Sequence, residues 1–398
     1  MRPDLIIRNG KIIDSSAIRE ETIYIKNGRI ISPYEIKDKS GVEEIDAKGK
    51  YILPGVIDSH THFQMDYNRK RPDTPDTELK SCDSFTYGTR NAILAGTTTI
   101  LDFAYQAKGF SITEAVSKRI EEMAHNCSCD YSLHCAISEV DKETINEMDD
   151  VKKMGISSFK IHTSYAKRGL RVEYGDIYHL MKKAKEIDCL VIAHSEEERL
   201  IEAFIHEMLD SADFDVKNIE RVRPEFVEAA AVCTLIMIAQ HTGCRFHIAH
   251  ISSVRGLKEV KIAKLQDYDI TAEITLPHLI LTSEQYSNDN AYLYAVTPPL
   301  RSADTVDRLW EAIKVEDVGI ISSNHCPFTR ELKNMEKGNF SNLPSGLPGA
   351  EVLLPMLFTT GYKEGKLTLP QIVRLLCENP AKRMVYIAVL NPEPSFSV

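Results

Sequence analysis

The sequence predicts an α/β fold, namely a (β/α)8 barrel preceded by a small β-domain. Eight short runs rich in aliphatic and β-branched residues follow one another after residue 50, and helical stretches lie between them. This alternation is typical of a parallel sheet whose crossover helices cover it. A closed barrel needs about 250 residues, so a chain of 398 residues leaves room for insertions after the fifth and eighth strands.

The first 50 residues predict the small β-domain. Apolar and polar residues alternate there, and Asn-Gly pairs interrupt the pattern at Asn9-Gly10 and Asn27-Gly28. Alternation interrupted by Asn-Gly indicates β-hairpins. We therefore assign residues 1–50 to the N-terminal part of a small β-domain.

The next 335 residues predict the barrel itself. We expect strands at 51–58, 97–103, 131–137, 157–161, 190–193, 245–249, 270–276 and 318–322. Apolar residues spaced by three and four predict helices at 85–94, 176–186, 224–241 and 305–313. The barrel is assigned to residues 51–385, and residues 386–398 form an atypical C-terminal tail.

Composition and charge exclude several classes of partner. The net charge of -10 comes from acidic and basic residues interspersed along the chain, without the basic run that would bind nucleic acid. No apolar stretch reaches the ~20 residues of a membrane span, and the first residues lack the apolar core of a secretory signal. We expect a cytoplasmic protein whose nine scattered cysteines are reduced.

Two histidines at the end of the first barrel strand suggest a metal site. His60 and His62 lie two residues apart, so both imidazoles face the same way from an extended segment. Imidazole is a common ligand of zinc. Taken alone, the pair is better explained as two solvated loop histidines, so a metal site needs further ligands from elsewhere.

Other strand ends supply such ligands. Chemistry in (β/α)8 barrels gathers at the carboxyl ends of the strands, where His194, His250 and Asn324 fall. Lys160 lies within the fourth strand between apolar neighbours, which favours chemical modification or a lowered pKa over a solvated lysine. We interpret His162 and His247 as structural, because neither is predicted to end a strand.

These motifs together resemble those of the amidohydrolase superfamily, within it the hydantoinase and dihydropyrimidinase branch. The resemblance extends to about residue 385 and rests on residues 55–64, 95–103, 297–301, 325–328, 346–351 and 379–382. It implies that the small β-domain is a β-sandwich. Because the chain ends without further strands of that domain, we expect the sandwich to be incomplete.

The resemblance also implies a site with two divalent metal ions, usually zinc, bridged by a lysine carboxylated on its amine. Lys160 occupies the position of that lysine. His60, His62 and Asn324 would complete the ligands of one metal, and His194 and His250 those of the other. Metal-activated water would then attack a ring amide.

Three further residues match positions that bind substrate in the family. Tyr165 matches a tyrosine that donates to the developing oxyanion, and the alternative is an aromatic residue of the barrel rim. The backbone near Thr297 and Ser345 would hold the ring. Because Gln64 follows His62 where dihydroorotases have arginine, a small neutral cyclic diamide is the expected substrate.

One departure from the family's motif affects catalysis. The family has an aspartate where this chain has Asn324, and an amide cannot accept a proton from the attacking water. We expect a metal-dependent hydrolase of hydantoin or dihydropyrimidine rings with impaired activity. A catalytically silent scaffold and another cyclic amidohydrolase, such as an allantoinase-like enzyme, remain as alternatives. By resemblance we expect a homotetramer or a homodimer.

Overall fold

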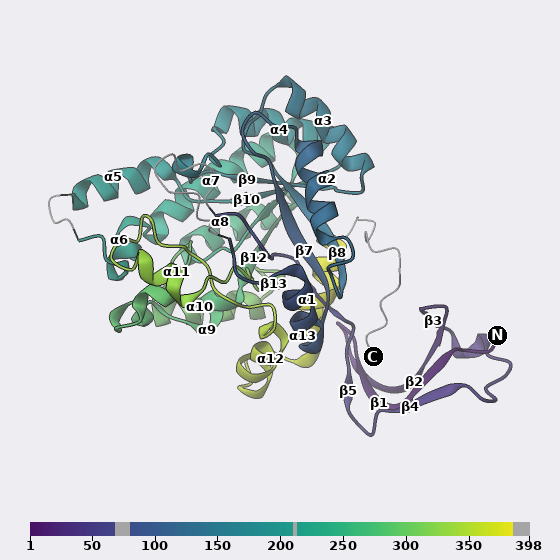
Figure 1. The fold of residues 1–398 in the computed structure, drawn as a ribbon. Coiled ribbons are helices and arrows are strands. Elements are labelled where there is room, and N and C mark those ends of the chain that lie inside the picture. Colours follow the sequence, from purple (N-terminus) through teal and green to yellow (C-terminus); the bar gives the residue numbers. More distant parts are fainter. Residues whose placement is uncertain (68–79, 210–212, 385–398) are drawn as a thin grey trace.

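The computed structural model describes residues 1–67, 80–209 and 213–384. The predicted tail, 386–398, lies outside the described residues. Figure 1 shows a barrel surrounded by helices, with a smaller sheet on one side of it.

The N-terminal residues form one five-stranded sheet, called here the N-terminal sheet. Its strands are β1 (Leu5–Ile13), β2 (Ile18–Lys26), β3 (Arg29–Ile31), β4 (Glu43–Asp46) and β5 (Tyr51–Ile52). Their order is β3-β2-β1-β4, and β5 also pairs with β1. The described residues of this region therefore form a single sheet, and no second layer of a sandwich is present among them.

The two Asn-Gly pairs have different roles in this sheet. Asn27 and Gly28 connect β2 to β3 with positive φ angles of 49° and 70°, as a tight hairpin turn requires. Asn9 and Gly10, in contrast, lie inside β1, where the pairing with β2 shifts between Ile7 and Gly10. The first pair was predicted as a hairpin turn and is instead a bulge.

Eight parallel strands form the barrel. They are β6 (Val56–Asp58), β7 (Thr97–Tyr105), β8 (Asp130–Ala136), β9 (Ser158–His162), β10 (Leu190–His194), β11 (Arg245–Ile248), β12 (Ile270–Thr275) and β13 (Ile320–Ser322), paired in chain order. Between the first and last strands, the bridge of Thr61 with His325 continues the pairing. The predicted eight-stranded architecture is confirmed.

The first predicted strand, 51–58, is divided between the two sheets. β5 pairs with β1 in the N-terminal sheet, whereas β6 pairs with β7 in the barrel. Pro54 separates them and has no N–H for a ladder. Gly55 follows, and a Cβ there would lie 1.9 Å from the Thr98 hydroxyl. The structural boundary between the sheets thus falls at residues 53–55.

Helices cover the outside of the barrel (Figure 1). They are α1 (Phe85–Leu94), α2 (Ile112–Met123), α3 (Lys142–Lys153), α4 (Tyr174–Glu186), α5 (Glu198–Met208), α6 (Ile219–Val222), α7 (Glu225–Thr242), α8 (Val254–Leu265), α9 (Leu276–Ile280), α10 (Ala303–Lys314), α11 (Arg330–Met335), α12 (Leu353–Met356), α13 (Leu369–Val373) and α14 (Asn379–Met384). Side chains that accept from the first-turn N–H groups cap several of them, including Ser84, Ser111 and Asp141.

The barrel interior changes in character along its axis. Near the start of the strands it is filled by an apolar cluster that includes Leu190, Ile192 and Ile320, with Met384 of α14 packed against it. Histidines and Lys160 take the place of such residues toward the carboxyl ends. The apolar cluster therefore supports a polar site above it.

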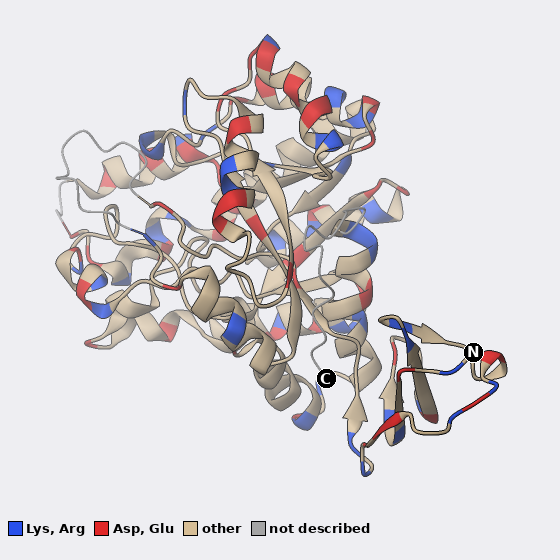
Figure 2. Ribbon diagram, turned by 45° about the vertical axis from the view of Figure 1, so that its right-hand side comes forward, with Lys and Arg blue, Asp and Glu red and all other residues tan. Residues whose placement is uncertain are grey.

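Charged residues are interspersed over the surface helices, as Figure 2 shows. Among the described residues, no helix has both the length and the apolar character that crossing a bilayer requires.

Candidate active site

All nine predicted site residues line one cavity of about 60 Å³ at the carboxyl ends of the barrel strands. They are His60, His62, Lys160, Tyr165, His194, His250, Thr297, Asn324 and Ser345. The histidines follow or end β6, β10 and β11, Lys160 lies within β9, and Asn324 follows β13. Residues more than 280 positions apart in the chain therefore meet at one end of the barrel.

The four histidines form two adjacent pairs. The rings of His60 and His62 lie 5.0 Å apart, and those of His194 and His250 lie 4.6 Å apart between centroids. His60 joins the pairs, since its ring is 5.4 Å from that of His250. Each pair presents two imidazoles to the cavity.

These histidines are neutral at physiological pH. All four are buried, and burial lowers the pKa of each imidazole, that of His194 to about 4. A neutral imidazole has one nitrogen lone pair available to a metal ion. The site is therefore prepared for a cation without having to lose protons first.

Buried carboxylates fix the orientation of one histidine in each pair. Glu273 of β12 lies 2.5 Å from Nδ1 of His60. Glu196 lies 2.7 Å from Nε2 of His194 and is itself paired with Arg223 at 2.5 Å. Each carboxylate accepts a hydrogen bond from one ring nitrogen of its histidine. The lone pair of the other ring nitrogen is then available for a hydrogen bond or for a metal ion in the cavity.

Lys160 lies in the middle of this ring of histidines without a partner. Its side chain is buried, and its Nζ makes no hydrogen bond within the described residues. Burial lowers the pKa of its amine to about 7. Half of the population is then neutral near pH 7, the form that reacts with carbon dioxide.

Asn324 lines the cavity, and its backbone adopts the left-handed conformation, with φ of 50°. No Asp or Glu belongs to the described residues that line the cavity. Consistently, within the described chain no three His, Cys, Asp or Glu side chains gather at one metal-holding point. Each histidine pair would need Lys160, and the first also Asn324, to complete a metal site.

The residues present fit two divalent cations. Nδ1 of His194 and Nε2 of His250 are 3.0 Å apart. Two tetrahedral nitrogen ligands of zinc lie about 3.3 Å apart, which follows from Zn–N distances near 2.05 Å. The amine of Lys160 and Nδ1 of His250 are buried and have no hydrogen-bond partner among the described residues. Burial of an unpaired polar atom costs free energy, and a further bound group that contacts these atoms would reduce that cost.

Tyr165, Thr297 and Ser345 lie at the mouth of the site. The hydroxyl of Tyr165 is 2.6 Å from that of Thr297, and its ring is 4.8 Å from that of His194. Burial raises the pKa of Tyr165 well above its usual value, so the phenol stays protonated and can donate a hydrogen bond.

Several lining residues were missed or misjudged from the sequence. His162 was interpreted as structural, but it ends β9 and lines the cavity, because that strand ends one residue later than predicted. Tyr105, at the end of β7, was missed for the same reason; β7 extends two residues further. His247 is indeed away from the cavity, with Nδ1 2.8 Å from the hydroxyl of Thr271.

The prediction of a neutral substrate from Gln64 has no support in this geometry. Gln64 does not line the site cavity, and its side chain accepts from the N–H of Phe85 at the start of α1. Glu196 and Glu273 were also missed. Their signal was present, since one lies two residues after His194 and the other interrupts a buried strand.

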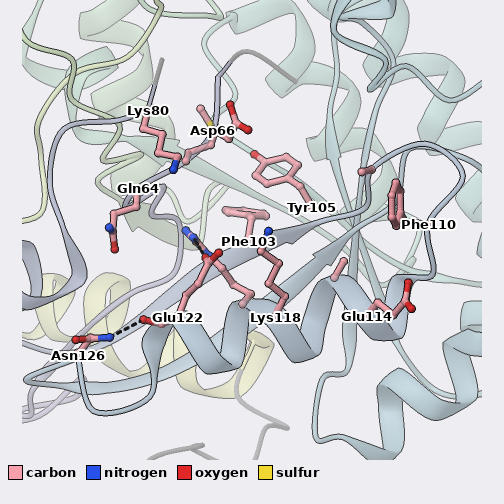
Figure 3. A pocket seen from close by; sticks show the side chains of 14 residues that line it. Gln64, Asp66, Lys80, Phe103, Tyr105, Phe110, Glu114, Lys118, Glu122 and Asn126 are labelled. Atoms are coloured by element: carbon pink, nitrogen blue, oxygen red, sulfur yellow. Dashed lines mark hydrogen bonds and ion pairs between the residues drawn. The ribbon is translucent and has the colours of Figure 1, made fainter. Parts of the chain in front are cut away.

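A larger cavity of about 620 Å³ adjoins the site and shares Met65 and Tyr105 with it. Figure 3 shows Lys118, Glu114 and Glu122 of α2 along one of its walls. Its acidic and basic side chains are balanced, in contrast to the site cavity.

Comparison with known proteins identifies the family. The sequence profile described as "Amidohydrolase family" matches residues 51–384. The chain belongs to the amidohydrolase family. Among its relatives is the D-hydantoinase of Streptomyces coelicolor, 29% identical over 385 residues, which are 95% of this chain and 80% of that protein. The D-phenylhydantoinase of Escherichia coli K12 is 28% identical over 382 residues, with the same coverage.

Solved structures confirm the fold of this amidohydrolase. A crystal structure of a D-hydantoinase superposes with a TM-score of 0.88 at 29% identity, covering 95% of this chain and 81% of that one. The dihydropyrimidinase of Brevibacillus agri gives 0.88 at 26% identity, with 97% and 84% coverage. The predicted resemblance to the hydantoinase and dihydropyrimidinase branch is thereby confirmed.

Proposed function

We propose that this amidohydrolase opens the ring of small cyclic amides of the hydantoin or dihydropyrimidine type by metal-dependent hydrolysis. The observation that supports this most is the set of four neutral histidines around one unpartnered buried lysine. The relatives named D-hydantoinase and dihydropyrimidinase support the same substrate class.

Two divalent metal ions, which we propose are zinc, would be held by His60, His62 and Asn324 on one side and by His194 and His250 on the other. Lys160, carboxylated on Nζ, would contact both. When bound, such ions polarise the scissile carbonyl and lower the pKa of water. Carboxylation converts a cation that would repel the metals into an anion that attracts them.

The chain's own residues then have distinct roles. The protonated hydroxyl of Tyr165 donates a hydrogen bond to the carbonyl oxygen as negative charge develops on it. Thr297 and Ser345 contact the ring and orient it. Glu196 and Glu273 hold the rings of His194 and His60 in place, so that the same nitrogen always faces the cavity.

Asn324 limits the rate. A carboxylate at this position would take the proton from the attacking water, and loss of a general base commonly lowers rates by about 10²–10⁴. The amide oxygen of Asn324 can still contact a metal but has no basicity.

The test compares the wild-type protein with Asn324→Asp after both have been loaded with zinc in bicarbonate. Hydrolysis of hydantoin and dihydrouracil would be followed by loss of ring absorbance. We expect slow turnover in the wild type and an increase of about 10²–10⁴ in kcat for the aspartate variant. No hydrolysis by either protein, with both fully loaded, would contradict the proposal.

A catalytically silent scaffold is the alternative function. A scaffold has no need for four histidines and a lysine at one cavity, which is why we favour the enzyme. The size of the natural ring is decided by comparing kcat/KM for hydantoin, which has five members, with kcat/KM for dihydrouracil, which has six. The same comparison, extended to allantoin, tests the alternative of an allantoinase-like enzyme. We further propose that the protein is cytoplasmic and forms a homotetramer or homodimer. Light scattering measures the molar mass of the particle and so tests the oligomeric state.

A further inference from the structure

Arg168 lines the candidate site but has no role in the proposed hydrolysis. It ends a short 3-10 helix, Ala166–Arg168, just beyond Tyr165, and its side chain lines the site cavity. Its guanidinium lies over the ring of Tyr67 at 4.1 Å and near that of Tyr165 at 5.3 Å. The two rings hold this cation at the mouth of the cavity.

Within the part of the chain that the structure describes, the guanidinium of Arg168 has no anionic partner. No ion pair or hydrogen bond of its side chain is found among residues 1–67, 80–209 and 213–384, and its buried Nε has no acceptor. Two other arginines of low exposure are paired: Arg119 with Asp102 at 2.6 Å and Arg223 with Glu196 at 2.5 Å. Arginine has five N–H donors, so an unpaired one in a cavity is unusual.

The surroundings of Arg168 favour an anion. The described lining residues include Lys160 and Arg168 but no Asp or Glu. The adjoining larger cavity, with balanced charges, has no such preference.

We propose that the ring bound here has a short carboxylate substituent, which Arg168 binds through its free N–H groups. This rests on the proposed function, because the ring must lie at the histidines for its substituent to reach Arg168. A guanidinium binds carboxylates in a bidentate way through its edge, whereas the contacts with Tyr67 and Tyr165 are with aromatic rings.

A structural role is the competing explanation. Arg168 could serve only to fix the two tyrosines through cation–π contacts. Tyr67 is connected to the substrate-contacting region, since its hydroxyl lies 3.4 Å from the N–H of Ser345. A purely structural Arg168 would change the affinity for charged and neutral ligands alike, whereas the proposed role changes only the charged one.

Two ligands of nearly equal size separate these roles: hydantoin-5-acetate, an anion, and hydantoin-5-acetamide, which is neutral. Their dissociation constants would be measured by calorimetry on the zinc-loaded protein in bicarbonate. The variants are Arg168→Gln and Arg168→Lys. Lys167→Gln is the matched control, because it removes the same charge from the exposed neighbouring residue.

We expect the wild type to bind the acetate at least tenfold more tightly than the acetamide, since hydrogen bonds to charged groups are worth about tenfold or more in affinity. Arg168→Gln should abolish this preference with the acetamide affinity unchanged within about threefold, and Arg168→Lys should retain part of it. Lys167→Gln should retain all of it.

Equal affinity of the wild type for both ligands would overturn the proposal, even if Arg168→Gln did not fold. A preference that persisted in Arg168→Gln would overturn it as well. The proposed function is tested separately. Binding of both ligands without hydrolysis by the wild type or Asn324→Asp would reject the enzyme and leave the anion site standing, whereas binding of neither ligand would reject both.

Discussion

Lys160 combines two properties that normally exclude each other, complete burial and a primary amine without a hydrogen-bond partner among the described residues. The pKa of about 7 in the folded protein lies below the usual 10.5. The unfolded chain therefore binds more protons between pH 7 and 10.5, so this lysine destabilises the metal-free fold increasingly as the pH falls through that range.

Replacement of this lysine should separate stability from function. We expect Lys160→Met to raise the melting temperature of the metal-free protein at pH 7, because an apolar side chain of similar length removes a buried, partly charged amine. The same variant should lose hydrolysis, because it lacks the carboxylated amine that we propose contacts both metal ions. Calorimetric melting at pH 7 and pH 9.5 tests this; a gain at pH 9.5 as large as at pH 7 would contradict it.

Metal loading should depend on pH through the same amine. Only the neutral amine reacts with carbon dioxide, and with a pKa of about 7 its neutral fraction rises from about one tenth at pH 6 to about nine tenths at pH 8. At a fixed pressure of carbon dioxide, we expect zinc uptake to be about tenfold faster at pH 8. His194, whose pKa is lowered to about 4, stays neutral at both values. Equal uptake rates would exclude carboxylation as the limiting step.

That the nine predicted residues would meet at one cavity was accessible from the sequence. Histidines at strand ends and a lysine between Phe159 and Ile161 can be recognised in the sequence. They are expected to meet because the carboxyl ends of the strands share one face of a barrel. The role of Arg168 was not accessible in this way, because a short helix with Gly169 at φ 69° directs the chain back over the cavity. Such a turn depends on tertiary packing, which no local pattern encodes.

At the scale of elements, β12 contributes to a site at which it supplies no metal ligand. Glu273 lies inside this strand, 2.5 Å from His60, which follows β6, and 3.8 Å from His247 of β11. Burial opposes its ionisation, but the contacts with these histidines keep the pKa of Glu273 well below its usual value. One carboxylate therefore connects three strands of the barrel.

Glu273→Gln should weaken metal binding while the fold is retained. The amide keeps the volume of the side chain but accepts the His60 N–H less strongly, and loss of such a supporting group typically costs 10–100-fold in metal affinity. Competition with a chromophoric chelator measures this. Glu207→Gln, at an exposed position of α5, is the control. Equal zinc affinity of Glu273→Gln and wild type would show that the orientation of His60 does not depend on this carboxylate.

Element boundaries were predicted less well than the elements themselves. Helix α1 was predicted with its observed bounds, since Ser84 caps it and Ala95-Gly96 ends it. The run 51–58, in contrast, was predicted as one strand, and Pro54 and Gly55 divide it between two sheets. The proline was visible, but which sheet each half joins depends on pairing with β1 and β7, more than 35 residues away in either direction.

At the scale of the whole molecule, the count of eight strands and their order followed from the repeated strand and helix pattern. This worked because the crossover connection is almost always right-handed and places successive strands side by side. The single N-terminal sheet was less accessible, because the same alternation of residues fits one layer of a sandwich or a lone sheet.

Metal removal should reveal how much the site contributes to the stability of the whole chain. A ligand that binds only the folded state stabilises it by about 2.7 kcal/mol at a hundred times its dissociation constant. We expect a chelator to lower the melting temperature by several degrees in the wild type. The Lys160→Met variant should show no change on chelation. A melting temperature of the wild type that did not respond to the chelator would contradict binding at this site.

We propose that four histidines and a carboxylated Lys160 hold two divalent ions at one end of the barrel. A crystal structure of the protein after treatment with zinc and bicarbonate, with anomalous data at the zinc edge, tests it most directly. We expect two anomalous peaks within the cavity, one beside His60 and His62 and one beside His194 and His250, with continuous density for a carboxylate on Nζ of Lys160. Metals beside a bare amine, or no metal at these histidines, would contradict it.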